Sequence, residues 1–322
     1  MSSGQEPPLE ANNGYGVPSG CQYGIRHGRQ SVHLTEVGGA LRDYLLDGRP
    51  LLDGYGPEEM CTGARGHSLI PWPNRVKGGR YEWGGQQLQL DLSEPDKGAA
   101  IHGLTRWRNW NVPVVEHENN KISFTYTLHA CQGWPWVLDC RLDYTLDDGG
   151  LSVRTTVTNR SPEPCPFGTG AHPYLSLGLR GQVIDPGLVQ VPGRTFLPVD
   201  DRGIPTGHEP VDGTEYDLRE LRQLGSRRID VAYTDLIRDA DGRARVKLVR
   251  ANGSAGVELW VDETYPYLEI FTGDTLPQPD RRRTGLGVEP MTCAPDAFNS
   301  GDGLITLEPG QSHSGQWGIT PL

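Results

Sequence analysis

The chain has 322 residues, of which 43 are Gly and 26 are Pro, and its formal net charge is −11 at neutral pH. Because nucleic acids and anionic membranes bind clustered Lys and Arg, this charge argues against both kinds of partner. No stretch approaches the roughly 18 apolar residues of a membrane span, and the N-terminus lacks the residue order of a signal peptide. We therefore predict a cytoplasmic protein.

Residues 1–20 are polar, rich in Gly and Pro and without periodicity, so we predict a disordered N-terminal tail. Residues 21–322 contain no internal repeat and no long linker, and we expect them to form a single domain. The six cysteines have no C-x-x-C spacing, which indicates reduced thiols and neither a disulfide framework nor a zinc site. The one dense basic run, Arg281–Arg283, is interpreted as a solvated loop.

Strand signals recur from about Tyr23 onward and are clearest in the middle of the chain. Apolar residues alternate with polar ones over 122–128, 138–146 and 151–157, and a turn at 147–150 joins the last two runs. A period of two predicts an antiparallel meander with one buried and one polar face.

Shorter segments complete the predicted set of elements. Further strands are predicted at 245–249, 257–261 and 267–271, and the best helix candidate is 217–224. Strands strung between turns, without regular strand–helix alternation, predict an all-β fold. We expect a large antiparallel β-sandwich with few short helices.

Two segments framed by Gly and Pro each hold one titratable residue, His172 within 168–174 and Glu289 within 288–299. Gly and Pro argue against an ordinary helix or strand interior at both places. A histidine and a carboxylate can move protons in both directions near neutral pH. Desolvation would raise the pKa of Glu289 and improve it as a base. The alternatives are a buried His172 bonded to a carbonyl and a Glu289 paired with an arginine.

Three further polar residues stand in predicted loops or at strand ends, where a rigid sheet can hold them open to a ligand. Arg75 has the fork geometry for sugar hydroxyls or a carboxylate, but it also suits an ordinary ion pair. His102 precedes Gly103, which allows close backbone approach; the alternative is a histidine that caps a turn. Asp230 either binds a ligand or pairs with a neighbouring arginine, and Asp235 is close enough to be confused with it.

These segments resemble, in the same order, those of the aldose 1-epimerase (galactose mutarotase) family. The likeness extends from about Ser68 to Gly318 and rests on Asn74-Arg75-Val76 with Gly79-Arg80-Tyr81, Ile101-His102-Gly103, His172-Pro173-Tyr174, Ile229-Asp230, and Val288-Glu289-Pro290 with Pro295-Asp296-Ala297-Phe298-Asn299. The resemblance implies a galactose mutarotase-like β-sandwich. It also implies interconversion of the α and β anomers of free aldohexoses, with no metal and no cofactor.

The resemblance assigns a role to each candidate residue. Glu289 matches the family's catalytic base and His172 its general acid, so the required state is an ionised Glu289 beside a protonated His172. His102, Arg75 and Asp230 match residues that bind the sugar. The implied partner is a small-molecule monosaccharide, and the expected assembly is a monomer or a homodimer. Four aromatic residues are candidates to stack on a sugar face: Trp72, Trp107, Tyr174 and Phe298.

Leu104 and Leu175 stand where many family members have Gly and Phe, which bears on substrate preference more than on reaction type. Three other functions stay open. An epimerase for a phosphorylated sugar needs a phosphate site, for which Arg281–Arg283 is the dense basic candidate. A carbohydrate-binding or sensor domain would keep the fold without catalysis. A glycoside hydrolase or lyase would use Glu289 and Asp230 as paired carboxylates.

Overall fold

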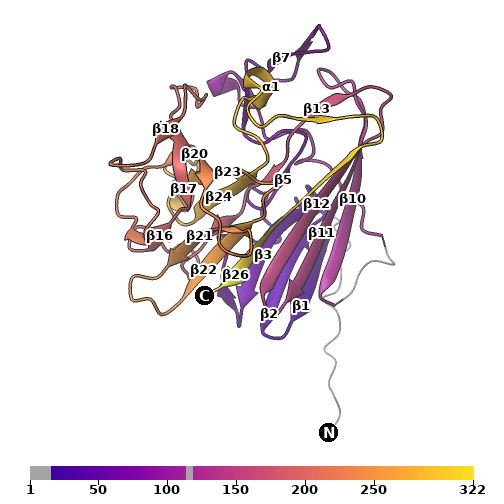
Figure 1. The fold of residues 1–322 in the computed structure, drawn as a ribbon. Helices are drawn as coiled ribbons and strands as arrows, with labels where there is room; N and C mark the ends of the chain where they lie inside the picture. Colours follow the sequence, from indigo (N-terminus) through magenta and orange to yellow (C-terminus); the bar gives the residue numbers. More distant parts are fainter. Residues whose placement is uncertain (1–15, 114–118) are drawn as a thin grey trace.

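The computed structural model of the chain describes residues 16–113 and 119–322. Two eight-stranded sheets and one four-stranded sheet make up most of this structure (Figure 1). In spatial order the first large sheet contains β10 (Lys121–Leu128), β11 (Leu138–Asp147), β12 (Gly150–Asn159), β26 (Ser312–Pro321), β22 (Gly256–Val261), β21 (Ala244–Val249), β16 (Leu188–Gln190) and β19 (Arg222–Gln223). All its strand pairs are antiparallel.

The second large sheet carries the segments that the sequence analysis singled out for chemistry. Its strands are, in spatial order, β18 (Glu209–Pro210), β17 (Gly193–Leu197), β20 (Asp230–Leu236), β23 (Tyr267–Phe271), β24 (Leu286–Met291), β14 (Gly170–Ala171) and β5 (Ser68–Leu69), with β15 (Tyr174–Leu175) also paired to β24. Its pairs are antiparallel as well. The all-β class and the antiparallel sandwich predicted from the sequence are confirmed.

Smaller elements cover the edges of these sheets. The four-stranded sheet consists of β1 (Gln22–His27), β2 (Gln30–Thr35), β3 (Ala40–Leu46) and β4 (Arg49–Pro50), and it lies beside the β10–β12 meander (Figure 1). Three strand pairs are β6 (Arg75–Lys77) with β9 (Ala99–Ile101), β7 (Arg80–Trp83) with β8 (Gln86–Gln89), and β13 (Cys165–Phe167) with β25 (Ile305–Leu307). Among the described residues, the helical elements are α1 (Ala297–Ser300) and the 3₁₀ turns η1 (Pro95–Lys97) and η3 (Pro279–Arg281).

The meander forms as its alternation predicts. In β11 the residues Leu138, Cys140, Leu142, Tyr144 and Leu146 are buried, and the residues between them are not. Their side chains join one hydrophobic cluster that also contains residues of the second large sheet and the four-stranded sheet. The strands predicted at 245–249, 257–261 and 267–271 are also confirmed, as β21, β22 and β23.

The helix predicted at 217–224 is wrong. Leu218, Leu221 and Leu224 follow one another at a helical spacing, but Leu221 is 44 % exposed while the other two are buried. The segment runs through turns instead and adds the edge strand β19 to β16. Pairing with a sheet edge therefore overrides the helical pattern here.

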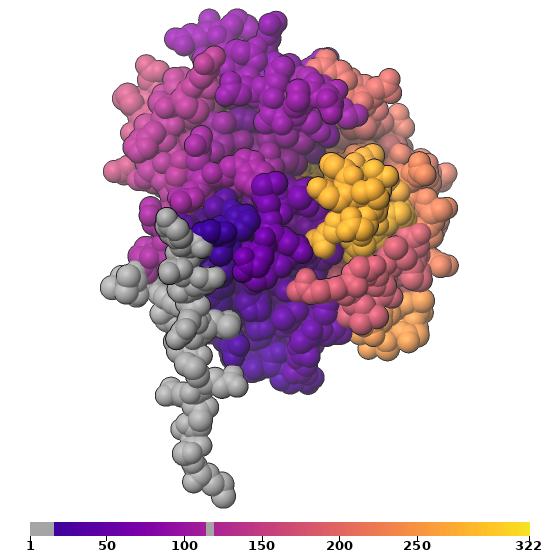
Figure 2. All heavy atoms as spheres, turned by 180° about the vertical axis from the view of Figure 1, so that it is seen from behind, coloured from indigo at the N-terminus to yellow at the C-terminus, as the bar shows by residue number. Residues whose placement is uncertain are grey.

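Segments far apart in the sequence adjoin on the face shown in Figure 2. Yellow C-terminal atoms lie beside purple atoms of the N-terminal third. One contact between segments this far apart is the hydrogen bond from the Asp296 N–H to the Arg75 carbonyl oxygen, at 2.7 Å. Residues 1–15 of the predicted tail lie outside the described residues. Ser19, still within the predicted tail, is buried, and its carbonyl oxygen accepts a hydrogen bond from the Val37 N–H, so the disorder prediction is wrong at this residue. All six cysteines are free. Within the described ranges, no helix has the length and apolar character to cross a membrane.

Candidate active site

Strand register brings His172 and Glu289 face to face. Both β14 and β15 pair with β24 in one continuous register, Gly170 opposite Met291 and Tyr174 opposite Gly287. Counting along that register places His172 opposite Glu289. Side chains directly opposite each other in an antiparallel pair lie on the same face at about 5 Å between Cβ atoms. The acid–base contact is thus built into the sheet.

Glu289 lies inside β24, so the prediction that Gly and Pro keep it out of a strand interior is wrong. The N–H groups of Val288 and Thr292 both donate toward the β14–β15 segment, to Pro173 and Thr169 at 3.0 and 2.9 Å. Pro290 therefore interrupts the ladder only on the side where the chain already breaks between β14 and β15. The β23 side keeps its pairing, which is why the strand tolerates a proline.

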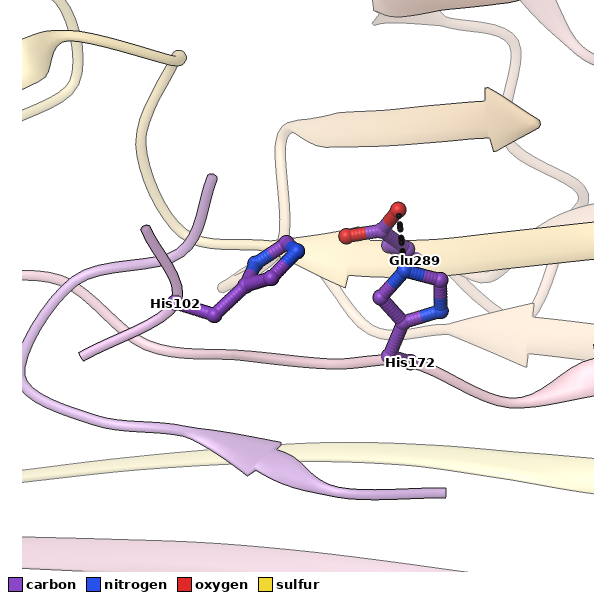
Figure 3. A group of neighbouring side chains, drawn as sticks. All are labelled: His102, His172 and Glu289. Atoms are coloured by element: carbon purple, nitrogen blue, oxygen red, sulfur yellow. Dashed lines mark ion pairs between the residues drawn. The ribbon is translucent and has the colours of Figure 1, made fainter. Parts of the chain in front are cut away.

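The contact between the two side chains is direct and buried. His172 Nε2 lies 3.1 Å from Glu289 Oε1, and the residues are 4 % and 2 % exposed. Figure 3 shows the His172 ring pointing toward the Glu289 carboxylate, with the His102 ring, from a third segment, beside them. Among the described residues, His172 Nδ1 and Glu289 Oε2 have no hydrogen-bond partner. Each group thus has hydrogen-bonding capacity left for a ligand.

The same register extends across the sheet. Glu289 lies opposite Glu269, and Asp230 lies opposite Phe271, which in turn lies opposite Gly287. Residues opposite each other, or two apart along a strand, share one face of a sheet. The Asp230 side chain therefore projects to the same face as the Glu289 and His172 side chains.

His102 enters from the β6–β9 pair. It directly follows β9 and has a φ of 61°, an uncommon backbone conformation for a histidine. The Asn74 N–H donates to His102 Nδ1 at 3.2 Å, and the His102 N–H donates to the Asn74 carbonyl oxygen at 2.9 Å. Burial lowers the pKa of His102 well below its usual value, so the ring is neutral. With Nδ1 accepting, the proton of the neutral ring lies on Nε2, and His102 is a hydrogen-bond donor.

Arg75 and Asp230 complete the predicted set. The Arg75 guanidinium forms a forked ion pair with Glu94, at 2.6 and 2.9 Å, so the ion-pair alternative is present. Asp230 is exposed and has no ion pair in the part of the chain that the structure describes; Arg228 instead lies 3.7 Å from Asp274. Asp235 accepts a hydrogen bond from a threonine hydroxyl and does not line the cavity described next.

All five predicted residues line one cavity of about 500 Å³. Sequence reasoning missed several other lining residues, of which the charged or aromatic ones are Glu94, Arg106 and Phe271. Of the four aromatic candidates, Tyr174 and Trp107 line the cavity, whereas Trp72 and Phe298 pack against each other at 5.6 Å. A larger cavity of about 640 Å³ on the polar face of the β10–β12 meander contains none of the five.

Burial sets the protonation of the central pair. It lowers the pKa of His172 to about 3, with the positive charges of Arg106 and Arg65 adding to the effect. It raises the pKa of Glu289 well above the usual value, and the Glu269 carboxylate pushes in the same direction. In the empty site the pair therefore holds one proton, on the carboxyl group. The predicted rise in the pKa of Glu289 is found, but the site without ligand does not favour an ionised Glu289 beside a protonated His172.

The three residues in Figure 3 also have the composition of a metal site. Their ligand atoms lie within 4.8 Å of one another. A metal-bound histidine nitrogen must offer a lone pair, and His102 Nε2 carries the proton because its Nδ1 accepts the Asn74 N–H. The donor set thus fits proton transfer and hydrogen bonding better than metal binding.

The basic run Arg281–Arg283 is solvated only in part, because Arg282 is exposed whereas Arg281 and Arg283 are half-buried. Arg283 donates to Asp185 and Asp274 at 2.6 and 2.9 Å, and Arg281 donates to the Gly54 carbonyl oxygen at 2.5 Å. None of the three arginines lines the cavity that holds His172 and Glu289. Arg282 and Arg283 instead line a neighbouring cavity that shares Asp230 and Phe271 with the first, so the run lies next to the site without forming its wall.

The sheets and the buried acid–base pair define a β-sandwich protein with a polar small-molecule cavity. The aldose 1-epimerase family model matches residues 22–320, and the chain belongs to that family. It is 32 % identical to the uncharacterized protein YihR of Escherichia coli over 92 % of this chain and 91 % of YihR. It is 26 % identical to the aldose 1-epimerase of the same organism, over 88 % and 86 % of the two chains.

Solved structures agree with this assignment at the level of the fold. The GalM/aldose epimerase homologue from Caenorhabditis elegans superposes with a TM-score of 0.81 at 17 % identity, over 93 % of this chain and 98 % of that one. The galactose mutarotase-like fold that the resemblance implied is therefore confirmed.

The His102 loop depends on Gly103, which generates a prediction. Gly103 has a φ of 72°, and a Cβ atom there would lie 2.1 Å from the Ile70 carbonyl oxygen. We expect Gly103→Ala to lower the free energy of unfolding by about 2–4 kcal/mol, through positive-φ strain and overpacking. Gly84→Ala is the matched control, because Gly84 has a φ of 57° and open space around it. It should cost only about 1 kcal/mol in urea unfolding; equal losses would contradict the close approach.

Proposed function

We propose that the protein interconverts the α and β anomers of free aldohexoses by opening and closing the sugar ring, with no metal and no cofactor. The observation that carries this proposal is the buried contact of 3.1 Å between His172 Nε2 and Glu289 Oε1 in a polar cavity. Family membership supports the reaction class. In this proposal Glu289 is the base and His172 is the acid.

The spacing of the pair suits the chemistry of an anomeric carbon. Ring opening removes a proton from the C1 hydroxyl and adds one to the ring oxygen O5, and both oxygens are bonded to C1. The acid and the base must therefore be neighbours, as His172 and Glu289 are. The paired carboxylates of glycoside hydrolases instead stand roughly 5–9 Å apart, with the scissile bond between them.

The proposed steps conserve protons. Glu289 takes the proton of the C1 hydroxyl while His172 gives one to O5, the C1–O5 bond breaks, and C1 becomes an aldehyde. Rotation about C1–C2 then presents the other face of the carbonyl group. On closure His172 takes the proton back from the O5 hydroxyl as O5 attacks C1, and Glu289 returns a proton to the carbonyl oxygen.

Substrate binding supplies the ionisation state that these steps need. In the empty site the shared proton lies on Glu289. A C1 hydroxyl that donates to the carboxylate stabilises its ionised form, and O5 accepts a hydrogen bond from a protonated His172. Both contacts favour movement of the proton over the 3.1 Å from Glu289 to His172.

The other predicted residues hold the sugar in this proposal. His102 donates a hydrogen bond to the sugar from Nε2. The Asn74 N–H occupies Nδ1, which leaves Nε2 facing His172 and Glu289. Asp230 has no ion-pair partner among the described residues and accepts from sugar hydroxyls. The forked ion pair with Glu94 fixes Arg75 through two of its three guanidinium nitrogens. The third nitrogen donates to a sugar hydroxyl.

The first test is polarimetry on freshly dissolved α-D-glucose and α-D-galactose. Glu289→Gln should lower kcat by about 10²–10⁴-fold, because it removes one positioned proton transfer. Glu258→Gln changes a buried glutamate of β22 outside the cavity and should keep the wild-type rate. A wild type that binds an aldose without exceeding the spontaneous rate would contradict the proposal and favour a sensor domain.

The pH dependence follows from the one-proton state of the pair. Activity should fall on the alkaline side as the pair loses its proton through the raised pKa of Glu289. It should fall on the acid side only near pH 3, as the pair gains a second proton through the lowered pKa of His172. The acid limb thus lies below the ordinary histidine range. Rates extrapolated to zero buffer at each pH check this, and an acid limb near pH 6.5 would refute the one-proton pair.

A second candidate substrate, a phosphorylated aldose, is favoured by Arg106. Arg106 lines the cavity, and its Nε has no hydrogen-bond partner within residues 16–113 and 119–322. No carboxylate described in the structure forms an ion pair with it; its one hydrogen bond is from Nη2 to the Ile101 carbonyl oxygen at 3.3 Å. The guanidinium is therefore available to an anionic group of a ligand in the cavity that holds His172 and Glu289.

Comparing glucose with glucose 6-phosphate tests this second candidate. If the phosphorylated sugar is the substrate, Arg106→Gln should raise its KM by about tenfold or more through loss of a charge-assisted hydrogen bond, and should change the glucose value little. Arg154→Gln, which changes an exposed arginine of β12 outside this cavity and its neighbour, is the control. Equal effects of Arg106→Gln on both sugars would exclude a phosphate contact.

A further inference from the structure

The His172 ring lacks the hydrogen bond that usually orients a proton-transferring imidazole. In the serine protease triad, a carboxylate bonded to the second ring nitrogen fixes the ring. Here His172 Nδ1 is buried and has no partner among the described residues. Because Nε2 alone contacts Glu289, another contact must fix the plane of the ring.

Tyr174 supplies that contact. Its ring stacks on the His172 ring with 4.8 Å between centroids and 11° between planes. The Tyr174 hydroxyl donates to the Gly63 carbonyl oxygen at 2.8 Å, which anchors the far end of the ring. Rotation of the imidazole about its side chain would therefore require displacement of an anchored tyrosine.

Arg65 packs on the same tyrosine. Its guanidinium carbon lies 4.5 Å from the centre of the Tyr174 ring, and Arg65 is only 1 % exposed. Nε and Nη2 both donate to Asp53 Oδ2, at 3.3 and 3.2 Å. A buried guanidinium on the face of a tyrosine is a favourable cation–π arrangement that a bound carboxylate holds in place.

The backbone joins these parts to His172. The Asp53 N–H donates to the Tyr174 carbonyl oxygen at 2.8 Å. Next to Arg65, the Gly66 N–H donates to the His172 carbonyl oxygen at 2.9 Å. The Thr284 hydroxyl also donates to Asp53, at 2.9 Å. Arg65 is thus fixed relative to both aromatic rings by short, buried bonds.

We propose that Arg65 is a positioning residue that acts on His172 through Tyr174, in the place of the usual hydrogen-bonded orienting group. This inference rests on the proposed function, in which His172 moves the proton to and from O5. Arg65 holds the tyrosine in place beside the imidazole. Its positive charge also disfavours a second proton on the His172–Glu289 pair.

The other charged and titratable groups around His172 come from three directions. Glu289 faces it from β24, His102 follows β9, and Arg106 lies on the next loop. His67, next to the Arg65 segment, also lowers the pKa of His172. Arg106 acts in the same direction as Arg65, so removal of Arg65 alone should shift the acid limb only partly.

Two substitutions separate the packing of Arg65 from its charge. Arg65→Lys keeps the charge and loses the planar guanidinium; kcat should fall about tenfold, with KM and the acid limb unchanged. Arg65→Met loses both; kcat should fall at least as far, and the acid-side apparent pKa should rise by up to about one unit. Tyr174→Leu, which removes the ring, should lose as much kcat as Arg65→Met, and Tyr174→Phe, which keeps the ring and loses only the hydroxyl anchor to Gly63, should lose less.

A readout independent of turnover accompanies the kinetics. The His172 Cε1 proton, assigned by its absence in His172→Gln, should show an upfield ring-current shift in the wild type. Tyr174→Leu and Arg65→Met should reduce that shift. If Arg65→Met does not fold, Asp53→Asn with Arg65→Met removes both buried charges together and is measured in its place.

The outcomes distinguish the two proposals. Folded variants with wild-type kcat, acid limb and His172 shift would overturn the positioning role, because a merely structural arginine would lower only the yield of folded protein. A wild type inactive on every aldose would refute the proposed function. In that case the ring-current shifts still show whether Arg65 orients His172.

Discussion

The candidate site depends on one constraint, the shared register of β14 and β15 on β24. That register puts His172 opposite Glu289, and the row continues to Glu269 on β23. Because side chains alternate between faces, a slip of one residue would turn one member of the pair to the other side of the sheet. The break between β14 and β15 leaves His172 and Pro173 outside regular pairing without changing the register.

Burial makes this pair costly to ionise and suited to proton exchange. Two charges with 4 % and 2 % exposure would lose most of their hydration, so the pair holds its single proton in the neutral form. The neighbouring Glu269 strengthens this preference, since a second carboxylate disfavours ionisation of the first. In the proposed function, a substrate that hydrogen-bonds to both groups shifts the proton from Glu289 to His172 across their contact. The strand register fixes the distance between the two side chains, and burial determines which of them carries the proton.

The sequence predicts those features whose signals are local. Strands such as β11 alternate because one face is buried, and the segments around His172 and Glu289 carry their own Gly and Pro. The strand β24 is buried on both faces and contains a proline, so neither alternation nor composition identifies it as a strand. Arg106 carries no motif, and only the fold shows that it lines the cavity and that its Nε has no hydrogen-bond partner among the described residues. The leucines around the edge strand β19 have a helical spacing, so the sequence predicts a helix there.

A buried carboxylate in a doubly buried strand is itself a functional signal. Each such group lowers stability unless it is paired or neutral, and the sheet holds two side by side, Glu269 and Glu289. Glu269 has a structural partner, because the Asn74 side-chain amide donates to it at 3.2 Å. Within the described ranges, the side chain of Glu289 has His172 as its one polar partner, and the second nitrogen of that stacked ring has no partner there. A fold that merely needed to be stable would gain from an apolar residue at either position. In the proposed function this pair supplies a proton that can move between two groups shielded from water.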